Sequence, residues 1–288
     1  MKKPKKIYWW LICFLSILIN FIIQKWPDKS MKVTFCDVGQ GDSILIQQDF
    51  FQIMIDSGKD ERVLGCLGQI LPVWDRTIEV IIITHGDEDH LGFFGEIMGI
   101  YDTNFIFFPD TTKDTAVIER VKEAIEHKQA LGALLKQPIL GQSISFPSGG
   151  ALTFLKLPDQ KSEQVDENDQ SIVFLLEYGE TRWLFTGDLG ANGELKLVKS
   201  GLLPRVNVLK VAHHGSDSSS NLDFLTTIQP DLSIISVGAD NKYGHPTTTV
   251  LENLNKIGSV ILRTDQLGDI TLTANETKIW VSRTHQRE

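Results

Sequence analysis

The sequence feature that most restricts the fold is an apolar run at 78–84 that ends in a dense polar cluster. The run is rich in β-branched residues, as expected of a central strand buried on both faces. The next six residues include two histidines and two aspartates, namely His85, Asp87, Asp89 and His90. Nitrogen and oxygen donors together suit Zn²⁺, Mn²⁺ or iron, and the absence of thiols disfavours a structural zinc site. An acidic surface loop is the alternative, and this spacing argues against it.

Three more polar clusters follow predicted strands, where loops can gather ligands on a rigid scaffold. Asp188 ends Thr-Gly-Asp, and its two oxygens would allow it to bridge two cations, although such a motif alone is usually a turn. His213 and His214 are adjacent. Neighbouring side chains on an extended chain point to opposite sides, so one of the two is expected to face the site. His245, in Tyr-Gly-His-Pro, adds one more imidazole.

A glycine-rich loop at 37–43 (Asp-Val-Gly-Gln-Gly-Asp-Ser) connects two predicted strands. Its glycines let the backbone approach another group closely. Its polar members Asp37, Gln40 and Asp42 are therefore candidates to contact substrate or metal ligands, while a plain β-turn is the alternative. Asp56 ends a further strand and is a candidate to orient a ligand.

Strand-like and helix-like stretches alternate along the chain, which predicts an α/β or layered α+β fold. Hairpins are expected around 148–150 and 179–180, where glycines interrupt apolar runs. The principal strands are expected at 31–37, 43–47, 52–56, 78–84, 171–178, 182–186, 206–212, 232–237, 261–263, 269–273 and 278–281. The principal helices are expected at 91–100, 115–130, 219–228 and 247–257.

The first thirty residues differ from the rest. Four lysines precede an apolar run at 7–23, which is near the lower length limit for a membrane-spanning helix. The positive flank should stay cytoplasmic. We therefore divide the chain into a membrane anchor or signal segment with linker at 1–30 and one folded domain at 31–288 that carries the polar clusters. The expected location is membrane-anchored with the domain outside the cytoplasm, or secreted if the segment is cleaved; no typical cleavage site follows it.

The three cysteines and two of the seven histidines are not expected to take part in the metal site. Cys13 lies in the apolar N-terminal run, while Cys36 and Cys66 lie in apolar patterns. They are expected to be small core residues rather than a disulfide framework or a metal cluster. His127 and His285 lie outside the post-strand loops and are expected to be solvated.

The formal net charge of −9 restricts the partners. Without the four N-terminal lysines the outer domain has a charge near −13, so its overall field does not attract polyanions. A nucleic-acid role therefore needs bound metal ions or a local basic strip. No protein partner can be inferred.

Taken together, these motifs resemble the metallo-β-lactamase superfamily. More narrowly, they resemble the hydrolase domain at the C-terminus of the competence DNA-uptake channel protein and stand-alone relatives of that domain. This resemblance implies an αββα sandwich, here preceded by one N-terminal hydrophobic helix. The motifs that carry it run in the expected order at 37–43, 85–90, 168–171, 186–188, 213–216 and 243–246.

The resemblance also implies two divalent metal ions, Zn²⁺ or Mn²⁺. His85 and Asp87 would hold one ion, and Asp89, His90 and His245 the other, with Asp188 bridging them. The superfamily's usual second histidine is Asp87 here, and its third-motif histidine falls near Asn168 or Asp169; both changes favour harder cations. The residues implied in catalysis are Asp89, Asp188, His213 and His214. Those implied beside substrate or behind the ligands are Asp37, Gln40, Asp42, Asp56, Asn168, Asp169 and Ser216.

Phosphodiester hydrolysis is the function that this resemblance favours, with DNA as the substrate most consistent with the family. A phosphorylcholine ester of the cell envelope, such as that of teichoic acid, is the second enzymatic hypothesis, since a cationic head group suits an acidic domain. A β-lactamase role is disfavoured because the motifs belong to another branch. A non-catalytic metal-binding sensor or binding module is the hypothesis from another class.

Overall fold

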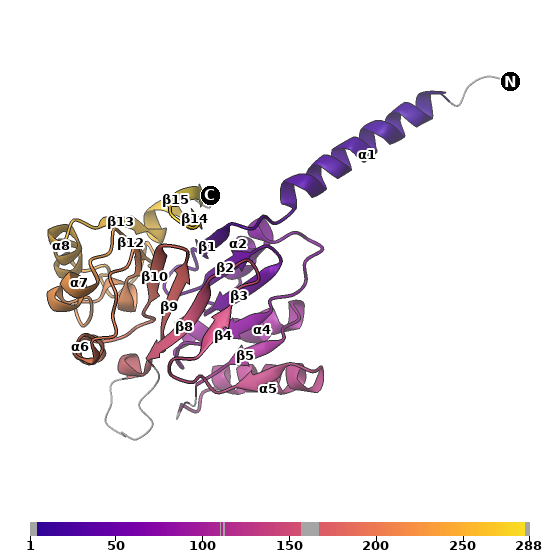
Figure 1. Cartoon of the computed structure of the whole chain (residues 1–288). Coiled ribbons are helices and arrows are strands. Elements are labelled where there is room, and N and C mark those ends of the chain that lie inside the picture. The colour runs from indigo at the N-terminus through magenta and orange to yellow at the C-terminus, as the bar shows by residue number, and fades with distance from the viewer. Residues whose placement is uncertain (1–4, 110, 112, 157–166, 286–288) are drawn as a thin grey trace.

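Two β-sheets form the centre of the structure (Figure 1). The computed structural model describes residues 5–109, 111, 113–156 and 167–285. The first sheet has the order β15 (Ile279–His285), β14 (Asp269–Ala274), β1 (Met31–Phe35), β2 (Ile44–Gln48), β3 (Phe51–Ile55), β4 (Val80–Ile82), β5 (Phe105–Phe107) and β6 (Leu134–Lys136). The second has the order β13 (Val260–Arg263), β12 (Leu232–Ile235), β11 (Val208–Lys210), β10 (Thr181–Phe185), β9 (Val173–Tyr178), β8 (Ala151–Lys156) and β7 (Ser143–Ser145).

The main hydrophobic core lies between the two sheets. Phe35 of β1 stacks on Phe185 of β10 with ring centroids 6.3 Å apart, and Phe107 of β5 packs against Phe154 of β8 at 5.1 Å. Trp183 of β10 is fully buried in the same cluster. Because both inner faces are apolar, the sheets remove each other's surfaces from water, which is the dominant favourable contribution to this packing.

Helices cover the outer face of each sheet. Those on the first sheet are α2 (Arg62–Ile70), α3 (Glu88–Leu91), α4 (Phe94–Ile100) and α5 (Ala116–Ala130). Those on the second are α6 (Ala191–Ser200), α7 (Leu222–Ile228) and α8 (Thr248–Lys256). The short helix α9 (Thr264–Leu267) joins β13 to β14, and 3-10 turns lie at Glu167–Gln170 and Ala212–Gly215. The four layers confirm the predicted αββα sandwich.

Most predicted elements are present with shorter bounds. The hairpin of β9 and β10 turns at Gly179 and Glu180 as expected. The predicted helix at 91–100 is divided into α3 and α4 at Gly92, whose backbone lies close to Lys59. Helices α2 and α6 were not predicted, because both contain glycine and neither has an N-cap residue whose side chain bonds to the first turn.

The N-terminal segment forms α1 (Lys5–Lys25), which stands off the two sheets (Figure 1). The side chains described for it, from Tyr8 to Asn20, are exposed. Trp26 packs edge-on against Phe50 with ring centroids 5.3 Å apart, just after the helix. Among the described residues, no helix combines the length and the apolar character that crossing a bilayer requires.

One sequence prediction about the cysteines is wrong. Cys36 and Cys66 are buried in the core as expected, but they form a disulfide instead of remaining free. Cys36 follows β1 and Cys66 lies on α2, and the helix packs on the sheet face that brings the two together. Sequence spacing alone cannot reveal this pairing, because it depends on how α2 is docked. Cys13 is free and exposed.

Replacing both bonded cysteines by alanine is expected to lower the free energy of unfolding by about 3 kcal/mol. The bond closes a segment with a sequence separation of 30, so its removal increases the entropy of the unfolded chain. Urea unfolding of the wild type and of the Cys36→Ala/Cys66→Ala variant would measure the difference. Cys13→Ser is the matched control and should unfold like the wild type; equal midpoints for all three proteins would contradict the prediction.

Candidate metal centre

The candidate site lies where loops from both sheets meet. β3 and β4 run parallel in one sheet, and β10, β11 and β12 run parallel in the other. Asp56, His85, Asp188 and His214 all lie in the loops at the carboxyl ends of these strands. The backbone nitrogen of Ile172 donates to the carbonyl of Thr84 at 3.2 Å, which joins the two sheets beside this point. The fold therefore brings together side chains that are far apart in the sequence.

Asp188 is at the centre of the cluster. Its Oδ2 lies 3.3 Å from His90 Nε2 and 3.4 Å from His214 Nε2. His214 Nε2 also lies 3.4 Å from Asp89 Oδ2, and the ring of His85 lies 4.1 Å from that of His90. Except for Asp89, which is partly exposed, these side chains are almost completely buried. Asp89 is therefore the one side chain of this cluster that solvent can readily reach.

Hydrogen bonds behind the histidines turn their Nε2 atoms toward the centre. His90 Nδ1 donates to Asp56 Oδ2 at 2.8 Å, and His214 Nδ1 donates to the carbonyl of Ser236 at 2.9 Å. Thr84 Oγ1 donates to Asp56 Oδ2 at 2.6 Å, which leaves it free to accept from His85 Nδ1 at 2.9 Å. Asp56 thus orients two histidines, one directly and one through Thr84, as outer-shell partners of metal ligands do.

The cluster fits a divalent cation. Among the described residues, four buried atoms that face one another have no hydrogen-bond partner: His85 Nε2, His90 Nε2, His214 Nε2 and Asp188 Oδ1. Leaving such atoms unpaired is unfavourable in a protein interior. Imidazole nitrogens and carboxylate oxygens are the donors that Zn²⁺, Mn²⁺ and iron accept. Several overlapping groups have ligand atoms close enough to share an ion, among them His85, His90 and Asp188, and Asp89, His90 and His214.

The structure distributes the predicted ligands differently from the resemblance. His214, not His245, lies beside Asp89 and His90. His245 is half-buried, and its ring lies 5.6 Å from that of His213. Asp87 Oδ2 is 3.7 Å from His85 Nε2, and the other Asp87 oxygen contacts the ammonium of Lys113.

His213 and His214 lie in a left-handed turn and not on an extended chain. Their φ angles are 49° and 54°, and Gly215 follows at 86°. Such conformations are unfavourable for residues with a Cβ and persist where the surroundings enforce them. Here Pro246 packs directly on Gly215. The turn sends the His214 ring into the cluster and leaves His213 half-exposed, with its Nδ1 3.1 Å from Ser218 Oγ.

Lys210 is a buried residue of the site that the sequence analysis missed. Its ammonium lies 2.7 Å from Asp42 Oδ2, and both side chains are almost completely buried. It also donates to the carbonyl of Val211 at 2.9 Å. Asp42 Oδ1 in turn lies 3.5 Å from His214 Nδ1. The sequence held one sign of this role, because Lys210 stands between apolar residues in a predicted strand, three positions before His213.

The other predicted residues lie around the cluster. Asp37 Oδ1 accepts from Gly39 N at 3.1 Å and so shapes its own loop, while Gln40 Oε1 is 3.5 Å from Gly238 N. Asp169 Oδ1 accepts from Gly193 N at 3.0 Å, so it stabilises the first turn of α6. In the hydrogen bonds between described residues, the partners of four predicted residues lie outside the ligand cluster: Asp37, Gln40, Asp169 and Ser216. Asn168 is half-buried in the same turn as Asp169.

The clustered carboxylates and imidazoles shift one another's pKa values. Burial lowers the pKa of His90 and of His214, but the carboxylates around them together outweigh burial and raise both values, Asp188 with Asp56 at His90 and Asp188 with Asp42 and Asp89 at His214. Burial would raise the pKa of Asp188, yet His214 and His90 lower it well below its ordinary value. The pKa of His85 is lowered, chiefly by burial. A bound cation would take the place of protons on His90 and His214, so binding releases protons.

Glu194 on α6 is expected to make stability fall as the pH rises. Burial raises its pKa to about 8, although it accepts from Ser220 N at 2.5 Å and from Asn221 N at 3.1 Å. Between the ordinary glutamate pKa and this value, the unfolded chain releases a proton that the folded chain keeps, so unfolding becomes easier. Urea unfolding from about pH 5 to about pH 8 should show a steeper loss for wild type than for Glu194→Gln. Equal slopes would contradict this, and exposed Glu126→Gln is the control.

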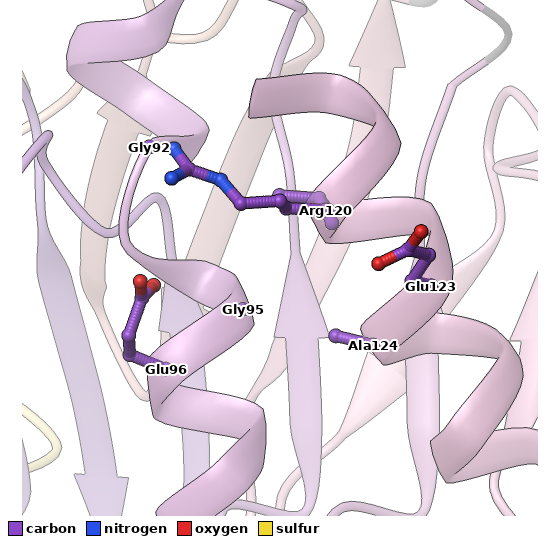
Figure 2. A pocket seen from close by; sticks show the side chains of 7 residues that line it. Gly92, Gly95, Glu96, Arg120, Glu123 and Ala124 are labelled. Carbon is purple, nitrogen blue, oxygen red and sulfur yellow. The ribbon is translucent and has the colours of Figure 1, made fainter. Parts of the chain in front are cut away.

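A groove between α4 and α5 is separate from the cluster. Figure 2 shows the guanidinium of Arg120 extending from α5 toward Gly92, with Glu96 and Glu123 beside it. The residues that line it are Gly92, Gly95, Glu96, Arg120, Val121, Glu123 and Ala124. None of these is a histidine or belongs to the cluster, so the groove is not the metal centre.

Comparison with known proteins agrees with the fold and the motifs. The profile of the family described as "Metallo-beta-lactamase superfamily" matches residues 36–239. "ComE operon protein 3" of Bacillus subtilis (strain 168) is 28% identical over 277 residues, which are 90% of this chain and 35% of that protein. "Competence protein ComA" of Neisseria gonorrhoeae is 28% identical over 90% of this chain and 34% of its own length. The chain thus spans about a third of these competence proteins.

Two solved structures share the fold at low sequence identity. The metallo-beta-lactamase fold protein YhfI from Bacillus subtilis has a TM-score of 0.53 and 15% identity, over 88% of this chain and 100% of that one. The Zn(2+)-bound PqqB from Methylobacterium extorquens has a TM-score of 0.54 and 12% identity, over 81% of this chain and 87% of that one.

Proposed function

The chain belongs to the metallo-β-lactamase superfamily, and from that premise we propose that it is a metal-dependent phosphodiesterase acting on a nucleic-acid strand. The observation that carries the proposal is the buried convergence of His85, His90, His214 and Asp188, with unpaired donor atoms facing one another. Such an arrangement is unfavourable without a cation and suitable for holding one.

The residues of the centre have distinct proposed roles. His85, His90, His214 and Asp188 hold divalent metal, which when bound acts as a Lewis acid and activates water. Asp89 is proposed to accept the proton of the attacking water, since its carboxylate is the most exposed of the cluster and lies 3.4 Å from His214 Nε2.

Two residues outside the buried cluster complete the proposal. Lys113 contacts Asp87 at the edge of the site and is proposed to attract the negative phosphodiester. His213, half-exposed beside the cluster, is proposed to donate a proton to the leaving oxygen. Both residues proposed for proton transfer, Asp89 and His213, are partly exposed.

Metal-restored turnover is the test of the proposed function. The full-length protein would be stripped of metal and assayed on bis-p-nitrophenyl phosphate with Mn²⁺, Zn²⁺ or Mg²⁺ added singly. Turnover should appear with at least one metal, and single-stranded DNA should then be cut. If folded, metal-loaded protein turns over neither these substrates nor p-nitrophenyl phosphorylcholine, the chain is a binding module. Turnover of the choline ester alone would favour an envelope substrate.

We also propose that the domain lies outside the cytoplasm, held by the apolar segment at 7–23. The disulfide between Cys36 and Cys66 supports this, because disulfides persist mainly in oxidising compartments. Protease added to spheroplasts should degrade the domain while a cytoplasmic marker survives. Recovery of the intact protein in the membrane pellet would support the anchor, and recovery in the medium would support cleavage. Full protection from protease would contradict the proposal.

A further inference from the structure

A row of aromatic rings leads from the buried centre to the protein surface. Successive ring centroids are 5.3 Å apart for His90 and His214, 6.3 Å for His214 and His213, 5.6 Å for His213 and His245, and 5.8 Å for His245 and Tyr243. The exposed fraction rises from 1% at His214 to 58% at Tyr243. The row therefore connects the proposed reaction centre with an exposed aromatic ring at its rim.

The exposed end of this row is fixed in position. Asn241 Oδ1 accepts from Tyr243 N at 3.2 Å and from His245 N at 3.0 Å. Asn241 Nδ2 donates to the carbonyls of Gly238 at 2.8 Å and His245 at 2.7 Å. The Tyr243 ring stacks on His245 with 27° between the ring planes. An exposed ring that is already ordered can bind another flat group with little additional loss of entropy.

The chemistry beside the ring indicates what it binds. Lys242 Nζ lies 5.3 Å from the centroid of the Tyr243 ring, in a domain that is acidic overall. A nucleotide supplies a flat base for the ring and a phosphate for the ammonium, the combination found where proteins bind single strands. The Lys242 ammonium would repel a quaternary ammonium group, which disfavours choline at this position.

We propose that Tyr243 and Lys242 form a binding subsite for the unpaired base and phosphate of a nucleotide next to the scissile bond. This rests on the proposed function and adds that the strand is single, because a base in a duplex is already stacked on both sides. Tyr243 is thereby a specificity-determining residue of the rim, while the ligands of the centre determine the chemistry.

Binding measured without cleavage tests the subsite. Fluorescence anisotropy would follow metal-loaded, full-length protein with a thymidine strand of about eight nucleotides and an abasic strand of equal length. Phosphorothioate linkages in both strands would slow cleavage. The wild type should bind the base-bearing strand more tightly, and Tyr243→Ala should lose on the order of ten-fold in affinity for it. Tyr243→Trp should keep the preference, as should Phe105→Ala, which removes an exposed ring at the opposite, amino end of β5.

Three results would overturn the subsite: an unchanged preference in Tyr243→Ala, equal affinity for duplex and single strand, or displacement of the strand by phosphorylcholine only when Tyr243 is present. The test is separable from that of the proposed function. Turnover of bis-p-nitrophenyl phosphate without any preference for bases would refute the subsite alone. A preference that depends on Tyr243, without turnover of any phosphodiester, would refute the phosphodiesterase alone.

Discussion

Replacing Asp188 by asparagine is expected to reduce phosphodiester turnover by on the order of a thousand-fold or more. The substitution keeps the shape of the side chain but removes the negative charge that lies 3.3 Å from His90 Nε2 and 3.4 Å from His214 Nε2. The centre then holds divalent metal less tightly. Turnover of bis-p-nitrophenyl phosphate and metal content after dialysis would both be measured, because both are expected to fall.

The control for this experiment is Asp223→Asn, which changes an exposed aspartate on α7 in the same way. It should keep wild-type turnover and metal content. If Asp188→Asn retained turnover within a few-fold of wild type, the centre described here would not be the reaction centre. Loss of turnover with unchanged metal content would instead assign Asp188 a role in the reaction beyond holding metal.

Lys210→Met is expected to lower the free energy of unfolding by about 3–5 kcal/mol. The change leaves the Asp42 carboxylate buried without the ammonium that lies 2.7 Å away in the wild type. Burial raises the pKa of Asp42, but Lys210 together with His214 and His90 outweighs burial and lowers it. The stabilisation is therefore present at neutral pH and is lost as the pH falls through the acidic range. Urea unfolding at neutral pH would measure the change.

A double variant distinguishes the ion pair from simple packing. Lys210→Met/Asp42→Asn removes both charges, so it should recover most of the stability that Lys210→Met loses. Lys122→Met, which removes an exposed lysine beside Glu119, should unfold like the wild type. A double variant as unstable as Lys210→Met would show that the lysine acts through its packed methylene groups and not through its charge.

The local patterns of the sequence agree with one another and predicted a layered α/β fold, while the resemblance of the motifs implied its αββα arrangement. The apolar run at 78–84 contains a buried strand, β4, and the interruptions at 148–150 and 179–180 are turns between paired strands. The motifs at 37–43, 85–90, 186–188 and 213–216 follow strands, as predicted, because ligand loops need a rigid support. The missed helices α2 and α6 are held by packing on the sheets, which local sequence does not record.

The sequence predicted less well which side chains make up the metal centre. Which of two adjacent histidines turns inward depends on the left-handed turn at His213 and His214, which the packing of Pro246 on Gly215 helps to hold. The placement of His214 rather than His245 beside Asp89 follows from that turn. Lys210 was overlooked because a lysine in a strand is usually exposed. Its burial is explained by the ion pair with Asp42, which is close in space but distant in the sequence.

Local patterns along the chain were enough to predict a layered α/β fold, the strand ends that carry the motifs, and the kinds of ligand atom they supply. Those properties depend on short-range periodicity and on residue chemistry. Three contacts could be seen only in the folded structure: the disulfide between Cys36 and Cys66, the ion pair between Lys210 and Asp42, and the approach of His214 to Asp89. Each of these is a contact between segments distant in the chain. Its formation depends on how sheets and helices dock, a long-range property that no local pattern encodes.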